Sequence, residues 1–209
     1  MMPENDREAT TQSKTTMASP ANYRLQTTLD LSKNRLLLFG IMAGGTLLLL
    51  LFSWLVLQFL TLTRPAEGHF GGSLDGLGVI VALGVIGGLT VFLVLLHESI
   101  HGLFFGLLTR ERPVFGFRGP YAYAAAPGCL ILRNRYLVIG LAPLLLISLL
   151  GLALLLVAPA EAIPVVALVV IFNAAGSAGD IFVVGRLLAC PGTSLVRDRG
   201  DGVDFYRPV

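Results

Sequence analysis

Long uncharged stretches separated by short polar segments dominate the chain. No charged residue occurs between Leu36 and Thr63. An α-helix rises ~1.5 Å per residue, so about 20 apolar residues cross ~30 Å of hydrocarbon. The pattern therefore predicts a first transmembrane helix over residues 36–63.

Three further apolar stretches follow, and each is bounded by charged residues or prolines. They predict transmembrane helices over about 77–109, 136–158 and 164–186. Few charges interrupt them: a cluster around Glu98 in the second stretch and Asp180 in the fourth. We expect an all-α polytopic membrane protein with four transmembrane helices, formed by residues 36–189.

The two ends of the chain and the loop between the second and third helices are polar. Residues 1–35 are rich in Ser, Thr and Asn and predict a disordered tail, and residues 190–209 predict a second tail. In the loop, aromatic residues alternate with small ones on both sides of a Gly-Pro pair: Phe115, Phe117, Tyr121 and Tyr123. This period of two predicts a β-hairpin; the alternative is an aromatic belt on an irregular interfacial loop.

Basic residues lie almost entirely in three segments. The N-terminal tail holds five Lys or Arg, the loop 110–135 five and the C-terminal segment four, which leaves only Arg64 elsewhere. With four spans these three segments share one side of the membrane. The positive-inside rule then predicts a multi-pass protein of the cell membrane with both termini cytoplasmic.

Composition narrows the classes of function. Hydrophobic residues make up 55% of the 209 residues, charged residues only 13%, and the mean hydropathy is +0.78. These values exclude a soluble domain, a nucleic-acid-binding domain and a disordered chain. The net charge of +2 is too small to indicate an anionic partner. We expect the lipid bilayer as a partner and no nucleic acid.

The candidate chemistry begins with an HExxH motif, His97-Glu98-Ser99-Ile100-His101. Residues four apart lie on one face of a helix, so two imidazoles can bind one metal ion while Glu98 stands beside them. Ionisable groups at membrane depth are costly, which favours a functional role. For either histidine alone, a hydrogen-bonded buried side chain is the alternative.

A catalytic zinc site usually has three protein ligands, and Asp180 is the candidate for the third. His101 precedes Arg110 by nine residues and Asp180 precedes Arg186 by six. These spacings place the two at similar depths, roughly 13 and 9 Å from the same ends of their helices. The alternative is a helix-end residue paired with Arg186.

Two polar residues share a helix face with Asp180. Ser177 is a candidate to orient its carboxylate, and Asn173 to hold a substrate backbone or a transition-state oxygen. Hydrogen bonding between helices is the alternative for both. His69 falls in a loop on the opposite side, and we do not count it as a ligand.

Together, HESIHGLFFG, PVFGF, YAYAAAPG, RNRYLVIGLAP and FNAAGSAGD resemble the zincin peptidase family of small bacterial membrane proteins. The likeness covers roughly residues 77–189. More distantly, the sequence is similar to site-2 intramembrane metalloproteases. The resemblance implies Zn²⁺ as cofactor, His97, His101 and Asp180 as ligands, and Glu98 as general base.

We therefore expect a zinc metallopeptidase that hydrolyses peptide bonds of membrane proteins or peptides. The alternatives are a metal or proton transporter and a non-catalytic metal-binding scaffold. A transporter is less favoured because no internal repeat and no further polar path are visible.

The topology can be tested by cysteine accessibility. A cysteine introduced at Ser73 should react with a membrane-impermeant reagent in intact cells, and one at Gly119 should not. Protection at Ser73 together with reaction at Gly119 would show that the orientation is wrong.

Overall fold

The computed structural model describes residues 22–30, 34–65, 76–118, 121–200 and 202–209. Its long helices are α2 (Arg35–Thr63), α3 (Gly76–Thr109) and α4 (Arg133–Val157). A short 3-10 helix, η1 (Ala160–Ala162), leads into α5 (Ile163–Gly176) and α6 (Ala178–Leu188). By length and apolar composition, three of the described helices can cross a membrane, and α5 with α6 makes a fourth if the bent pair counts as one span.

The fourth predicted helix differs from the expectation because it is broken at Ser177. The two halves meet at a bend of 45°. Ser177 lies among glycines and alanines, and its hydroxyl donates to the Asn173 carbonyl at 2.8 Å. Hydroxyls that bond the carbonyl four residues earlier bend helices, and the glycines beside it have low helix propensity.

The helices pack closely at the end of the bundle that lies away from the sheets. Val56 and Leu60 of α2, Leu155 of α4 and Val170 of α5 form a buried cluster there. Gly151 brings α4 against α5, since a Cβ atom at this position would lie 2.3 Å from a Val170 methyl group. Large apolar side chains cover the outer faces of the helices, as a lipid environment favours.

A four-stranded antiparallel sheet corrects the expectation of an all-α fold. Its order is β1-β6-β5-β4, built from β1 (Tyr23–Asp30), β4 (Ile131–Leu132), β5 (Leu195–Asp198) and β6 (Gly202–Pro208). Strand β1 lies in the segment 1–35 that we expected to be disordered, and β5 and β6 lie in the expected tail 190–209. Residues 1–21 and 31–33 of that first segment lie outside the described residues.

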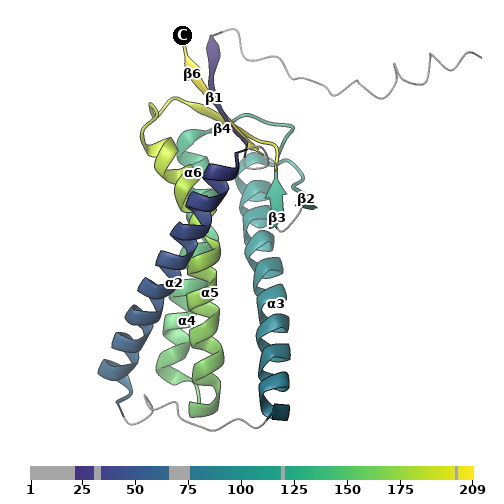
Figure 1. The fold of residues 1–209 in the computed structure, drawn as a ribbon. Coiled ribbons are helices and arrows are strands. Elements are labelled where there is room, and N and C mark those ends of the chain that lie inside the picture. The colour runs from purple at the N-terminus through teal and green to yellow at the C-terminus, as the bar shows by residue number, and fades with distance from the viewer. Residues whose placement is uncertain (1–21, 31–33, 66–75, 119–120, 201) are drawn as a thin grey trace, which may run out of the picture.

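The sheet brings β1, from the first described segment, together with the C-terminal strand β6 at one end of the helix bundle (Figure 1). Strands β1 and β6 pair from Tyr23 with Pro208 to Asp30 with Gly202. Thr28 adds a side-chain hydrogen bond to Asp204 at 2.8 Å. Such pairing between distant segments has no local signature in the sequence, which explains the missed strands.

The predicted hairpin between α3 and α4 is confirmed. Strands β2 (Val114–Arg118) and β3 (Tyr121–Ala125) pair antiparallel, with Phe115 opposite Ala124. The hairpin packs on α3 where Gly102 has no side chain: a Cβ atom there would lie 2.2 Å from the Phe115 ring. The glycine after the HExxH motif therefore lets β2 lie directly over the helix that carries the two histidines.

Candidate metal centre

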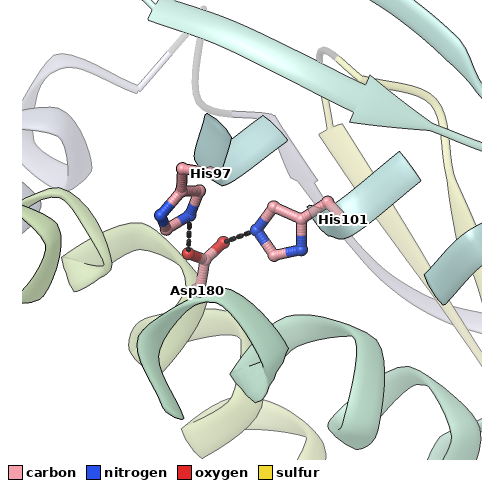
Figure 2. A group of neighbouring side chains, drawn as sticks. All are labelled: His97, His101 and Asp180. Carbon is pink, nitrogen blue, oxygen red and sulfur yellow. Dashed lines mark hydrogen bonds and ion pairs between the residues drawn. The ribbon is translucent and has the colours of Figure 1, made fainter. Parts of the chain in front are cut away.

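The two histidines and Asp180 meet at the junction of α3 and α6 (Figure 2). His97 and His101 stand one turn apart on α3, with ring centroids 4.9 Å from each other. The Asp180 carboxylate lies between them: Oδ2 is 3.1 Å from His97 Nε2 and Oδ1 is 3.4 Å from His101 Nε2. Both histidines are buried. The structure thus brings together the three residues that the sequence marked as ligands.

The outer nitrogen of each imidazole is held by an oxygen acceptor. His97 Nδ1 lies 3.0 Å from Asn173 Oδ1, and His101 Nδ1 lies 3.0 Å from the Ile139 carbonyl. The orientation of the Asn173 amide follows from its other contact, because Nδ2 donates to the Pro143 carbonyl at 3.2 Å. Each Nδ1 therefore donates a hydrogen bond to its oxygen acceptor, and each Nε2 is turned toward Asp180, which leaves the two Nε2 atoms as the ones that could bind a metal ion.

This arrangement fits a zinc ion. Two imidazole nitrogens and a carboxylate converge, and the possible ligand atoms all lie within 4.8 Å of one another. The nitrogen–oxygen distances of 3.1 and 3.4 Å are close to the edge of a zinc tetrahedron, about 3.3 Å for bonds of ~2.0–2.1 Å. Two imidazoles and one carboxylate are also a ligand set that zinc uses in hydrolases.

Glu98 lies beside this cluster and is half-buried. Its carboxylate accepts a hydrogen bond from the backbone N–H of Ala124 in β3 and interacts electrostatically with both histidines and Asp180. The hairpin thus fixes the side chain next to the three converging groups. With Asp180, two carboxylates face one small buried volume, and a divalent cation would neutralise their combined charge.

Asn173 and Ser177 are both buried, but they serve different contacts from those expected. The Asn173 amide contacts His97 and the Pro143 carbonyl, so it orients a histidine, although the residue also lines the cavity beside the cluster. The Ser177 hydroxyl bonds the Asn173 carbonyl, not the Asp180 carboxylate. His69 lies outside the described residues.

A cavity of about 430 Å³ opens onto the cluster. Leu38 and Ile41 of α2 line one side of it and Thr90 and Leu93 of α3 another. Strand β3 contributes Ala122 to Ala124, and the four-stranded sheet adds residues from β5 and β6. The candidate metal ligands are therefore reached from an apolar space between helices and sheets.

Two residues of this cavity were missed by sequence reasoning. Tyr136 of α4 donates its hydroxyl hydrogen bond to Asp198 Oδ2 at 2.5 Å, and the Gly200 N–H donates to Asp198 Oδ1 at 2.8 Å. Asp198 is buried although it stands in the charged run RDRGD, which is typical of a solvated tail. Burial raises the pKa of the Asp198 carboxyl to about 6, although the hydrogen bonds from Tyr136 and Gly200 lower it in part.

A comparison with models of protein families gives a match. The model of a family described as "Putative zincin peptidase" matches residues 90–195, just over half of the chain. The matched segment contains the two histidines, Glu98 and Asp180. Neither a curated protein nor a solved structure matches the sequence.

The metal centre predicts one equivalent of zinc per chain in the purified protein. Replacing a residue that only orients a metal ligand typically lowers metal affinity by ~10- to 100-fold. Replacing a proposed ligand itself, His97, His101 or Asp180, with Ala should lower zinc affinity by at least as much. Metal analysis after dialysis against a chelator of known affinity measures the loss. His69→Ala removes the third histidine of the sequence and is the matched control. Full zinc retention by His97→Ala would remove the assignment.

The buried Asp198 predicts a pH-dependent stability. Between pH ~4 and the folded-state pKa of about 6, the folded protein keeps a proton that the unfolded chain has released. Stability therefore falls as the pH rises through this range, and the penalty is constant above it. Asp198→Asn cannot ionise. The melting temperature of this variant minus that of the wild type, both metal-free in detergent, should therefore increase from pH 4.5 to pH 6.5. A difference in melting temperature that stays constant over this range would contradict the raised pKa of Asp198.

Proposed function

We propose that this chain, which belongs to the putative zincin peptidase family, is a zinc-dependent membrane-embedded metalloprotease that hydrolyses peptide bonds of membrane proteins or peptides. One observation carries the proposal. Two imidazole nitrogens and the Asp180 carboxylate converge beside Glu98, in helices apolar enough to span a membrane. This is the set of groups that metal-assisted hydrolysis requires.

The residues have distinct roles in this reaction. His97, His101 and Asp180 would hold the zinc ion, which would supply the Lewis acidity that activates a water for attack and polarises the scissile carbonyl. Glu98 takes the proton from the attacking water and passes it to the leaving amine. The N–H of Ala124 holds the carboxylate in place, while Asn173 and the Ile139 carbonyl keep both imidazoles in the metal-binding tautomer.

The cavity supports a substrate that arrives as an extended segment. Among the described strands, β3 pairs with β2 on one edge only. The N–H of Ala124 points from the other edge toward Glu98, and Ala122 lines the same cavity. We propose that an unwound stretch of a membrane-spanning substrate pairs with this edge, which would bring its backbone carbonyl to the catalytic groups.

The apolar walls of the cavity support access from the bilayer. Apolar residues of two helices line the cavity: Leu38 and Ile41 of α2, and Leu93 and Val94 of α3. We further propose that the sheets and both termini face the cytoplasm. The pairing of β1 with β6 supports a common side for the two tails, and the distribution of Lys and Arg supports the cytoplasmic side.

The mechanism predicts that Glu98→Gln keeps zinc and the fold but loses cleavage. The amide preserves the shape of the side chain and removes the proton acceptor, so the rate should fall by ~10²- to 10⁴-fold. Comparative membrane proteomics of cells with wild type or Glu98→Gln identifies the substrates, which accumulate uncleaved in the variant. Their cleavage in detergent by the purified proteins then gives the rate.

Glu161→Gln is the matched control, because Glu161 is an exposed acid on η1 and does not line the cavity. It should cleave at the wild-type rate. Loss of zinc from Glu98→Gln would make Glu98 a ligand and weaken the hydrolase proposal. Zinc binding by the wild type with no substrate difference between the strains would favour a transporter or scaffold.

A further inference from the structure

Pro143 stands inside α4, fully buried, one turn after the carbonyl that holds His101. In a regular helix the carbonyl of residue 139 accepts from the N–H of residue 143. Proline has no N–H, and its ring presses against the carbonyl four residues earlier. The Ile139 oxygen is thus released from the helical ladder, and His101 Nδ1 lies 3.0 Å from it.

The carbonyl of Pro143 itself leads to the second histidine. It accepts from Asn173 Nδ2 at 3.2 Å, and this contact turns Asn173 Oδ1 toward His97 Nδ1 at 3.0 Å. An amide flipped by half a turn would place Nδ2 against His97 and favour the wrong tautomer. Position 143 of α4 therefore affects both imidazoles: its missing N–H frees the carbonyl that holds His101, and its own carbonyl orients the amide that holds His97.

We infer that Pro143 is the positioning residue of the metal centre, acting on His101 through the Ile139 carbonyl and on His97 through Asn173. The inference rests on the proposed zinc site. Any other residue at position 143 would supply an N–H that binds the Ile139 oxygen and draws it back along the axis of α4. His101 Nδ1 would then share its acceptor, and the Nε2 lone pair would lose its fixed direction.

The experiment compares two variants that restore this N–H. Pro143→Ala favours the helix, and Pro143→Val also keeps most of the buried volume. Pro164→Ala is the matched control, because Pro164 lies in the first turn of α5, where N–H groups have no helical partner. Zinc affinity is measured in detergent against a chromogenic chelator, the visible spectrum of the Co²⁺ form reports ligand geometry, and melting of the metal-free protein reports the fold.

Both restoring variants should bind zinc ~10- to 100-fold more weakly than wild type, as is typical for changes behind a metal ligand. Their Co²⁺ spectra should change, while the metal-free melting temperature should not fall. Pro164→Ala should match the wild type in all three measurements.

Each other result overturns the inference in a different way. If the wild type binds no zinc, the proposed function fails with it. If wild type and both Pro143 variants bind zinc equally and give the same Co²⁺ spectrum, the positioning role is wrong and the proposed function stands. If Pro143→Val alone recovers wild-type affinity, the volume of the ring matters and not the missing N–H. An equal loss in Pro164→Ala would point to general helix packing.

Discussion

The contact of the Asp180 carboxylate with two imidazoles is the interaction on which the rest of the candidate site depends. Its oxygens lie 3.1 Å from His97 Nε2 and 3.4 Å from His101 Nε2 in a buried region. The Nδ1 atoms of both rings are held by oxygen acceptors on the far side, so the Nε2 atoms are the ones turned toward Asp180. Glu98 adds a second carboxylate beside the same cluster. Ionisable groups at membrane depth are costly unless they are paired, and a divalent cation would pair with both carboxylates.

The break between α5 and α6 allows one segment to contact both sides of the same ring. Asn173 before the break reaches Nδ1 of His97 at 3.0 Å, and Asp180 after it reaches Nε2 at 3.1 Å. Seven residues cover ~10 Å along a helix, enough to place an imidazole between the two side chains. The new helix α6 also begins just before Asp180, and its positive N-terminal end stabilises the carboxylate. The bend at Ser177 is thus part of how the site is assembled.

The sequence predicted those features whose cause is local. The spacing of His97 and His101 requires only helix geometry, and the depth of Asp180 requires only the lengths of two helices; the aromatic alternation likewise predicted the hairpin. The Ile139 carbonyl could not be found this way, because every residue carries one and only the absence of an N–H at Pro143 distinguishes it. Asp198 was missed for a different reason: it is buried where β5 packs near α4, and its contact with Tyr136 spans 62 residues of sequence.

The proposed metal ligands and the residues that complete the cavity come from different parts of the chain. The family match, residues 90–195, contains all the proposed ligands, yet the cavity around them is completed by residues on either side of it. Leu38 and Ile41 come from α2, and Asp198 and Val203 come from the sheet that β1 closes. Gly200 has φ of +82°, and a Cβ atom there would lie 2.2 Å from the Tyr123 ring, so the sheet and the hairpin meet directly above the cavity. Substitutions in α2 or in the sheet can therefore alter the shape of the cavity without touching a proposed ligand, whereas the proposed ligands all lie in the matched segment.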